Sequence, residues 1–299
     1  MNPMATAWLE IGLALLLAPL LNSVISRVKA VFAGRQGPPL LQPYFDLAKL
    51  LRKGAVYSPT TTWIFRAGPI LGLATTVAAL LLVPAGRISA PVAFPADFIL
   101  LAYLLALGRF FTISAALDTG SSFEGMGASR EAHFAALAEP TLFLGLAALA
   151  RKTGALSLSQ ILPAASPLAP EVALVAGALA VVLLCENSRI PFDDPNTHLE
   201  LTMVHEVMVL DHSGPDLAFI QYAAALKLWL WSSVLAGLLV PAGATAWPAS
   251  LTTTLGVFAL AGCIGVVEST MARVRLLRVP HLLAAALTLS AVATILVVR

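Results

Sequence analysis

Long apolar stretches recur along the whole chain, separated by shorter segments that hold most of the charged residues and many of the prolines and glycines. Each stretch continues for about 18 residues or more, enough for a helix to cross a bilayer core of about 30 Å. The stretches are rich in Leu and Ala without period-2 alternation, which favours helices over a transmembrane barrel. We therefore predict an all-α, polytopic integral membrane protein with about eight transmembrane helices, at residues 4–26, 63–84, 97–118, 131–150, 171–188, 217–240, 252–272 and 280–298.

The composition agrees with this pattern. Hydrophobic residues make up 59% of the 299 residues and charged residues only 11%, whereas a soluble domain carries about a quarter charged residues. No separate soluble domain is visible, so we expect residues 1–299 to form a single membrane domain. The first apolar run is followed, not preceded, by basic residues (Arg27 and Lys29), which indicates a retained first helix rather than a signal peptide.

The distribution of Lys and Arg predicts the orientation of the helices. Twelve of the 18 basic residues lie in or beside alternate loops, four lie on the opposite side, and Arg109 and Lys227 lie within helices. Because basic residues are enriched in cytoplasmic loops, this asymmetry predicts that both termini lie outside.

Two of the inner loops, 27–62 and 187–216, are long and chemically dense, and we expect them to form a docking surface. In the first loop, residues 40–53 predict a helix with an apolar stripe and basic residues near its end. This pattern is typical of an interfacial helix, although an ordinary solvated loop helix remains the alternative. The stripe consists of Leu40, Tyr44, Leu47, Leu50 and Leu51.

The second of these loops, with its flanks, concentrates acidic residues and histidines. Asn196 is a suitable N-cap for a predicted helix over 197–210. His198, His205 and His212 are seven residues apart, or about 10 Å per step along a helix, so one metal ion cannot join them. Histidines beside carboxylates favour proton handling, and a hydrogen-bonded docking surface is the equally weighted alternative. The carboxylates are Glu186, Asp193, Asp194, Glu200, Glu206 and Asp211.

Several ionisable residues fall inside predicted helices, where insertion costs about 2.5–3.5 kcal/mol each. Glu139 precedes Pro140, which loosens the helix backbone, so we interpret Glu139 as a proton-relay residue. For Arg109 and Lys227, a functional role and a static ion pair are equally open.

The chain contains no motif for redox, phosphate-binding or hydrolytic chemistry: CxxC, Walker A, GxGxxG and GxSxG patterns are all absent. Its two cysteines, Cys185 and Cys263, lie in apolar runs and are interpreted as packing residues. We therefore expect no metal, redox centre or catalytic motif in this chain, and electron chemistry would have to reside on another chain.

A series of motifs, in order along the chain, resembles the respiratory complex I subunit 1 family. Within it, the chain is most similar to membrane subunits of membrane-bound nickel–iron hydrogenases of the formate hydrogenlyase and hydrogenase-4 type. The motifs are Gly34-Arg35-Gln36-Gly37-Pro38, Leu41-Gln42-Pro43-Tyr44, Asp46-Leu47-Ala48-Lys49-Leu50-Leu51, Asp118-Thr119-Gly120-Ser121, Gly127-Ala128-Ser129-Arg130-Glu131, Ala138-Glu139-Pro140, Glu186-Asn187-Ser188-Arg189-Ile190-Pro191-Phe192-Asp193 and Glu268-Ser269-Thr270-Met271-Ala272-Arg273.

The resemblance implies a membrane anchor and proton-coupling subunit that links a peripheral redox arm to ion translocation. The implied partners are an iron–sulfur small subunit, a large nickel–iron-hydrogenase-like subunit and antiporter-like membrane subunits, with all cofactors on those partners. It also implies the cytoplasmic (inner) membrane of a prokaryote and no nucleic-acid partner. With the charge pattern, it suggests a proton path of Glu139, Glu186, Asp193, Glu200, His198, His205, Glu206, Asp211, Lys227 and Glu268, and redox-arm docking by Arg35, Gln42, Asp46, Lys49, Arg130 and Arg189.

The sequence departs from that family at two places. Complex I relatives carry glutamates where this chain has Asn196 and His198, and they carry Gly-Pro-Asn where it has Gly37-Pro38-Pro39. Both departures favour the hydrogenase branch over a quinone-site subunit of a complex I-type oxidoreductase, which remains the first alternative. A stand-alone ion transporter is a weaker alternative, because no inverted repeat is visible. A related complex without nickel also stays open.

Overall fold

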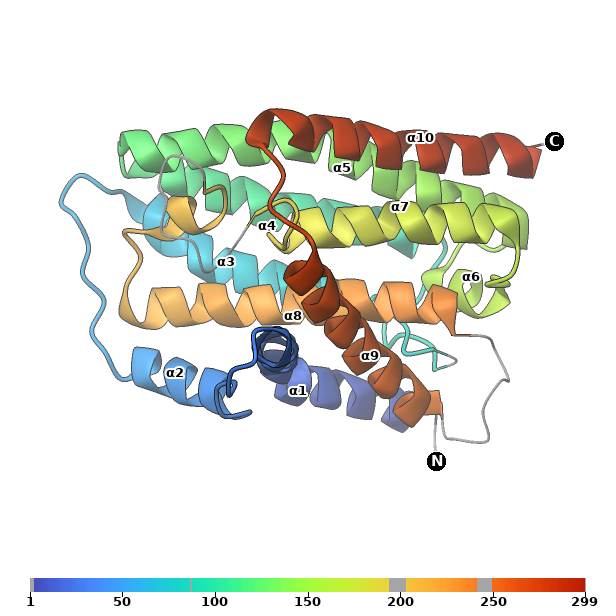
Figure 1. The fold of residues 1–299 in the computed structure, drawn as a ribbon, viewed down its shortest axis with the longest axis horizontal. Coiled ribbons are helices and arrows are strands. Elements are labelled where there is room, and N and C mark those ends of the chain that lie inside the picture. The colour runs from blue at the N-terminus through green and yellow to red at the C-terminus, as the bar shows by residue number, and fades with distance from the viewer. Residues whose placement is uncertain (1–2, 87, 194–202, 241–248, 299) are drawn as a thin grey trace.

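A computed structural model describes residues 3–86, 88–193, 203–240 and 249–298, and the regular structure of these residues is helical apart from one isolated bridge between Ala85 and Ile88. Figure 1 shows a bundle of long helices with short helices at its ends. The α-helices are α1 (Pro3–Phe32), α2 (Gln42–Leu51), α3 (Trp63–Leu80), α4 (Asp97–Asp118), α5 (Ser122–Thr153), α6 (Leu158–Ala164), α7 (Pro170–Glu186), α8 (Gly214–Leu239), α9 (Ala249–Thr270) and α10 (Val279–Val298), and the 3-10 turns are η1 (Glu206–Val209) and η2 (Leu276–Arg278).

Seven helices among the described residues are long and apolar enough to cross a membrane: α1, α3, α4, α5, α8, α9 and α10, the last together with η2. The all-α membrane fold predicted from the sequence is thereby confirmed. The remaining predicted span, residues 171–188, corresponds to α7, which has 17 residues. At 1.5 Å per residue it is about 26 Å long, slightly less than a typical bilayer core. The total of eight spans therefore stays a prediction.

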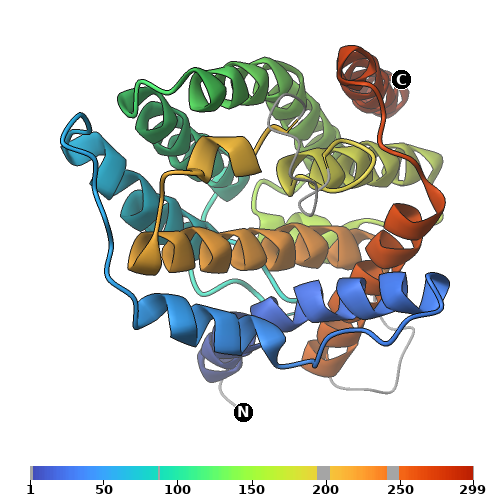
Figure 2. The ribbon, with the colours of Figure 1, turned by 60° about the vertical axis from the view of Figure 1, so that its left-hand side comes forward.

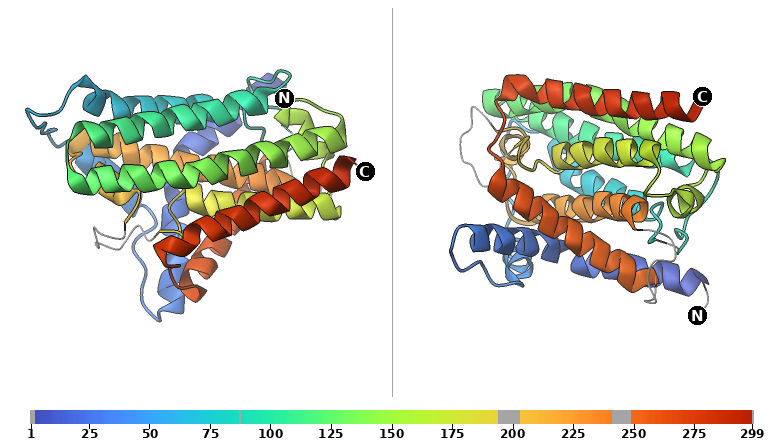
Figure 3. Two further views of the ribbon diagram at one scale, coloured as in Figure 1. Left: turned by 90° about the horizontal axis from the view of Figure 1, so that it is seen from above. Right: turned by 45° about the vertical axis from the view of Figure 1, so that its right-hand side comes forward.

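Helix α8 lies at the centre of the bundle. It contacts α1, α2, α3, α6, α7 and α9, and Figure 2 shows it between α1 and α2 on one side and the α4–α5 pair on the other. Helix α9 is inclined to its neighbours as it crosses the bundle (Figure 3). Both chain ends lie at one end of the bundle, and α2 and η1 lie at the opposite end (Figure 1), which we call the inner end.

Helix α1 contains Pro19, which has no N–H to donate to the carbonyl of Leu15. The hydroxyl of Tyr222 on α8 donates to that carbonyl at 2.8 Å. The hydroxyl of Tyr44 on α2 donates to the neighbouring carbonyl of Leu16. The predicted helix in loop 27–62 is thus confirmed as α2, and its Tyr44 joins it to the proline position of α1.

The inner ends of the helices differ most from the sequence-based prediction. Helix α5 begins at Ser122 rather than near residue 131, so the predicted loop 119–130 shrinks to a turn and Arg130 lies on a helix. This early start buries Gly127, whose added Cβ would lie 2.8 Å from the carbonyl oxygen of Val204. The hydrophobic pattern did not predict this part of α5, because residues 122–130 pack against the inner loop rather than forming part of a long apolar stretch. Helix α6 was not predicted.

The helix predicted over 197–210 is wrong in the part that the structure describes. Only the 3-10 turn η1 forms within 203–210, and residues 194–202 lie outside the described residues. The backbone N–H groups of Val204 and His205 donate to the Asp193 carboxylate, at 2.9 and 3.3 Å. This side-chain acceptor provides an alternative to helical hydrogen bonds, which explains the irregular backbone.

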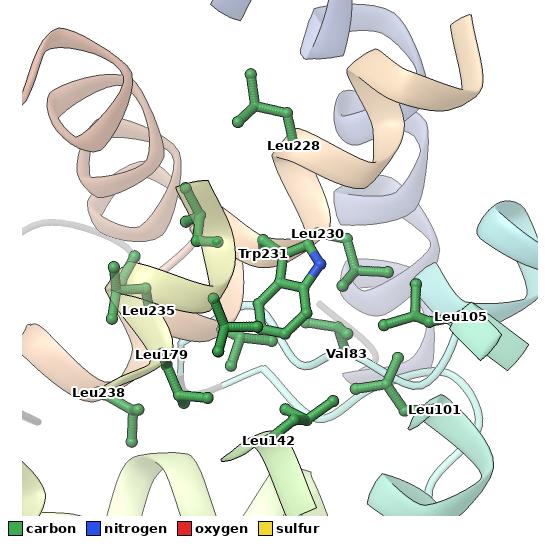
Figure 4. Close-up of a cluster of buried hydrophobic side chains, with 14 of the residues drawn as sticks. Val83, Leu101, Leu105, Leu142, Leu179, Leu228, Leu230, Trp231, Leu235 and Leu238 are labelled. Carbon is green, nitrogen blue, oxygen red and sulfur yellow. The ribbon is translucent and has the colours of Figure 1, made fainter. Parts of the chain in front are cut away.

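The apolar core centres on Trp231 of α8, which is almost fully buried. Figure 4 shows its indole among the side chains of Leu101, Leu105, Leu142 and Leu179, contributed by α4, α5 and α7. Such a large buried side chain fills the space between four helices and fixes their spacing. The same tryptophan forms one side of the charged cluster described next.

Candidate functional site

Five ionisable side chains from four helices meet within the bundle, and we call them the Arg109 cluster. Arg109 comes from the middle of α4, Glu131 and Glu139 from α5, Glu186 from the last turn of α7 and Lys227 from α8. The five residues are spread over positions 109 to 227 of the chain, and no sequence motif links them. Tertiary packing therefore creates the cluster.

Arg109 is the centre of the cluster, and its side chain is only 7% exposed. Its two terminal nitrogens form ion pairs with Glu139 and Glu186, and its Nε lies 3.3 Å from Glu131 Oε1. A guanidinium group is planar and always charged, and it carries five N–H donors, so a single side chain can serve three carboxylates.

Lys227 provides the second positive charge of the Arg109 cluster. Its Nζ lies 2.8 Å from Glu186 Oε2, so Glu186 is held by two cations. Three carboxylates therefore face two cations, which leaves one carboxylate charge without a partner if all three are ionised. Glu139 is the most exposed of the three carboxylates at 40%, and among the described residues it forms an ion pair with Arg109. Glu139 is thus the least enclosed of the three carboxylates.

Apolar groups surround the charged atoms on the side away from the inner end. Leu105, Leu142, Val182 and Trp231 line the same narrow space as Arg109, Glu139 and Glu186. In such a low-dielectric setting an unpaired charge is costly, so the ion pairs of the cluster depend on one another.

A cavity of about 100 Å³ lies next to the Arg109 cluster. Arg109, Glu131, Glu186 and Lys227 form its charged wall. Its remaining polar wall includes Thr75, Thr76, Thr112, Asn187, His205 and His212. Helices α3, α4 and α8 and the turn η1 supply its apolar lining. The cavity therefore joins the Arg109 cluster to the inner loop 187–213.

Helix α5 and the segment after α9 hold the inner loop from two sides. Glu124 Oε1 accepts a hydrogen bond from the backbone N–H of Asp211 at 3.1 Å, and Arg130 donates to the carbonyl oxygen of Met203 at 2.8 Å. On the other side, Asp193 forms an ion pair with Arg273 at 2.8 Å. The loop is therefore a fixed part of the membrane domain along its described residues.

A second buried ion network surrounds Glu268 of α9, and we call it the Glu268 network. Lys29 of α1 lies 2.8 Å from Glu268 Oε2, and Arg189 lies 3.4 Å from Glu268 Oε1. Arg189 also donates to the side-chain oxygen of Asn22. None of these residues lines the 100 Å³ cavity, so Glu268 lies apart from the Arg109 cluster.

The residues predicted to form the proton path are therefore distributed over several places. Glu139, Glu186 and Lys227 belong to the Arg109 cluster, and His205 lines the cavity. Asp193 is buried, Glu206 begins η1 and Asp211 is exposed at the inner end. Glu268 forms the separate network. His198 and Glu200 lie outside the described residues.

The residues predicted to dock a redox arm also divide into two groups. Arg35, Asp46 and Lys49 are exposed at the inner end, and Gln42 donates to Asp46 at 2.9 Å along α2. Arg130 and Arg189 instead contact the inner loop and the Glu268 network.

The proton path predicted from the sequence did not include Arg109, Glu131 or His212, although a functional role for Arg109 was left open and His212 was one of the three histidines considered for proton handling or docking. The isolated arginine in an apolar helix and the Glu131–Glu139 spacing of a little over two turns were the available signals. Asp118 caps the start of α3 by accepting from the N–H groups of Thr62 and Phe65, at 2.7 and 3.3 Å. Among the described residues, no group of three or more His, Cys, Asp or Glu side chains is placed to hold a metal ion.

Comparison with known proteins gives a full-length match. A family model described as NADH dehydrogenase matches residues 5–299. Formate hydrogenlyase subunit 4 of Escherichia coli (strain K12) is 33% identical over 277 residues, covering 87% of each chain. Hydrogenase-4 component C of the same organism is 32% identical over 294 residues, covering 93% of this chain and 91% of the relative.

More distant relatives extend the comparison. A protein of Rubrobacter xylanophilus that is named as a subunit of NADH-quinone oxidoreductase is 31% identical over 242 residues, covering 75% of this chain and 70% of that protein. A chain in the structure of an archaeal respiratory membrane complex, the membrane-bound sulfane sulfur reductase, has the same fold with a TM-score of 0.84. That chain is 22% identical, and the match covers 99% of this chain and 100% of the other.

Proposed function

This chain belongs to the family described as NADH dehydrogenase, the complex I subunit 1 family, and on that basis we propose that it couples a peripheral redox arm to proton translocation within a hydrogenase-type membrane complex. The proposal has two parts: a subunit role shared with its relatives, and a proton-handling role for the Arg109 cluster. The relatives at 32–33% identity are named as parts of formate hydrogenlyase and hydrogenase-4, which supports the hydrogenase-type assignment.

One observation carries the proton-handling role: three carboxylates and two cations meet inside the bundle beside a cavity that extends to the inner loop. Buried charges of this number are costly, and a scaffold alone could use apolar packing instead. The excess carboxylate gives the cluster a place for one proton. Movement of the inner loop would change the polar groups at the cavity and thereby the affinity of the cluster for that proton.

The proposed partners follow from the exposed inner end. Arg35, Asp46 and Lys49 present charged groups there, which suits the docking of an iron–sulfur subunit and a large hydrogenase-like subunit. In this proposal the iron–sulfur clusters and a nickel–iron centre belong to those subunits. Antiporter-like subunits would lie beside this chain in the prokaryotic cytoplasmic membrane, with both termini outside.

The test compares carboxylates of the Arg109 cluster with Glu171, which lies at the opposite end of α7 from Glu186. The complex with Glu186→Gln or Glu139→Gln is reconstituted in vesicles, driven by viologen dye or hydrogen, and assayed for proton uptake with a pH-sensitive dye. We expect proton uptake to fall at least about tenfold, as for loss of a proton-transfer group. Glu171→Gln is the matched control, because Glu171 lies in the first turn of α7 and pairs with Lys152. Normal uptake by an assembled Glu186→Gln complex would refute the coupling role.

A quinone-site role is the second candidate function. It is favoured by the 31% identity to a protein named as part of NADH-quinone oxidoreductase. Quinone that co-purifies with the complex, together with loss of turnover under quinone-site inhibitors, would support it over the hydrogenase-type role.

A further inference from the structure

The cavity beside the Arg109 cluster has an inner wall whose role the proposed function leaves open. That wall includes His212, which lies two residues before the start of α8. His212 is 5% exposed, and its ring stacks on Phe65 of α3 with centroids 3.9 Å apart and planes 9° from parallel. The histidine is thus held in one orientation between the start of α3 and the start of α8.

The His212 ring carries an unused polar atom. Its Nδ1 is buried and has no hydrogen-bond partner among the described residues. A buried polar atom without a partner costs about 1–3 kcal/mol, so its presence calls for an explanation. Packing on Phe65 alone would be served as well by a phenylalanine or tyrosine ring. The nitrogen atoms therefore indicate a function that an apolar ring cannot perform.

The cavity is large enough to hold water. About 10–15 Å³ of probe-occupied volume is needed for one water molecule, so a cavity of about 100 Å³ has room for several. The hydroxyl of Thr112 and the charged groups on the opposite wall supply hydrogen-bond partners for them. A short water chain could therefore extend from His212 to Glu186 or Glu131.

Three glycines of α3 and α4 line this space. A Cβ added to Gly108 of α4 would lie 2.7 Å from Thr75 Oγ1, and one added to Gly68 of α3 would lie 2.8 Å from Ala115 Cβ. These two glycines let α3 and α4 approach closely. Gly72 also lines the cavity, but no atom lies within 4 Å of the position of its Cβ. A larger side chain at Gly72 would therefore occupy free space.

We propose that His212 is a proton-relay residue, which passes protons between the inner loop and the Arg109 cluster through water in this cavity. This inference rests on the proposed function and deepens it, because it assigns the inner end of the path to one side chain. His205 lines the same cavity, and its backbone N–H is bound to Asp193. His212 lies deeper in the protein and stacks on α3.

The transfer balances without any other reactant. One ring nitrogen of His212 accepts a proton from the loop side, and the other nitrogen releases a proton to cavity water. The water chain then delivers a proton to a carboxylate of the Arg109 cluster, and the imidazole returns to its neutral form. Burial lowers the pKa of His212 to about 4 from its ordinary 6.5, so the resting ring is neutral near pH 7 and holds the added proton only briefly.

Other titratable groups around the cavity could influence this transfer. They come from every element that lines the cavity except α3 and η1, whose lining residues are uncharged. They are Arg109 of α4, Glu131 of α5, Glu186 of α7, His205 of the inner loop and Lys227 of α8.

The first experiment removes the nitrogens but keeps the ring. The complex with His212→Phe is reconstituted in vesicles and assayed for proton uptake with a pH-sensitive dye, with turnover driven by viologen dye or hydrogen. We expect uptake to fall at least about tenfold while the complex remains assembled. His133→Phe is the matched control, because His133 is exposed on α5 away from the cavity. Normal uptake by assembled His212→Phe complex would overturn the inference.

A rescue experiment separates proton transfer from structural support. His212→Ala leaves a space beside Phe65, and imidazole added to the medium should restore part of the proton uptake in a manner that depends on pH. A purely structural role predicts that imidazole and an apolar molecule of the same shape, such as cyclopentane, act equally. Equal effects would contradict the relay role even if the substituted complex were less stable.

A third variant blocks the water path without touching a charged group. Gly72→Leu should fill the cavity and lower proton uptake. Gly12→Leu is the control, because Gly12 lies on the exposed face of α1 and also has free space around the position of its Cβ.

The Glu186→Gln complex distinguishes failure of the proposed coupling role from failure of the His212 relay. If it loses uptake while His212→Phe and Gly72→Leu retain it, the coupling role stands and the relay is refuted. If all three retain it, both are refuted.

Discussion

The Arg109 cluster and the Glu268 network are both buried ion networks between helices, yet they differ in charge and in surroundings. In the Arg109 cluster three carboxylates share two cations beside a cavity. In the Glu268 network one carboxylate with no exposed side-chain surface is held by Lys29 and Arg189. Carboxylates therefore outnumber cations in the Arg109 cluster, whereas cations outnumber carboxylates in the Glu268 network. The proposed function assigns proton handling to the first arrangement and a fixed connection between helices to the second.

The two networks also connect different parts of the protein. The Arg109 cluster joins α4, α5, α7 and α8, and the Glu268 network joins α1, α9 and the start of the inner loop. Asp193 and Arg273 extend the second connection to the segment after α9. The inner loop is therefore attached to α9 by the Arg189–Glu268 ion pair and to α1 by the Arg189–Asn22 hydrogen bond, and it reaches the Arg109 cluster across the cavity.

The largest expected effect comes from removing the central cation of the Arg109 cluster. Arg109→Gln would leave three carboxylates with Lys227 alone, and breaking a buried ion network costs about 3–5 kcal/mol. We expect a loss near the upper end of that range, measured as a lower melting temperature of the purified complex. Arg52→Gln is the control, because Arg52 is exposed. Equal melting temperatures for the two variants would show that the Arg109 contacts contribute little to stability.

Removing the carboxylate of the Glu268 network should have a smaller effect on stability and leave function intact. Glu268→Gln leaves Lys29 and Arg189 without their shared partner, and both cations keep some solvent exposure. We expect a loss of about 3 kcal/mol in thermal unfolding, with proton uptake per turnover unchanged in the complexes that assemble. Loss of uptake would instead place Glu268 in the proton path, as the sequence first suggested, and would remove the functional contrast between the two networks.

The smallest expected effect concerns the pH dependence of stability at the cavity. Burial lowers the pKa of His212 to about 4, so the unfolded chain binds its proton more tightly than the folded chain. The contribution of buried His212 to the free energy of unfolding is therefore complete above about pH 6.5 and is lost as the pH falls towards 4. The loss is about 2 kcal/mol between pH 7 and pH 4.5. His212→Phe should remove this part of the pH dependence. The measurement is the melting temperature of each variant complex as a function of pH, with His133→Phe as the comparison. Parallel pH profiles for the two variants would contradict it.

The candidate site could be anticipated only in part. Glu139, Glu186 and Lys227 stood out because each is an ionisable residue in an apolar run. Arg109 and Glu131 share the same signal, but a single sequence does not say which charges meet. The helix predicted over 197–210 was wrong in its described part because the Asp193 carboxylate bonds two backbone N–H groups there, a tertiary contact that no periodicity encodes.

The sequence by itself determined the membrane environment and the helical class, because about 18 apolar residues in a row leave the backbone no other way to satisfy its hydrogen bonds in lipid. It also marked the helix that became α2 and the dense inner loop. Tertiary structure alone decided which charges became partners. The close approach of α3 and α4 at Gly68 and Gly108 and the early start of α5 at Ser122 bring the cavity, the inner loop and the Arg109 cluster together. These contacts join residues that are far apart in the chain, and only packing in three dimensions fixes them.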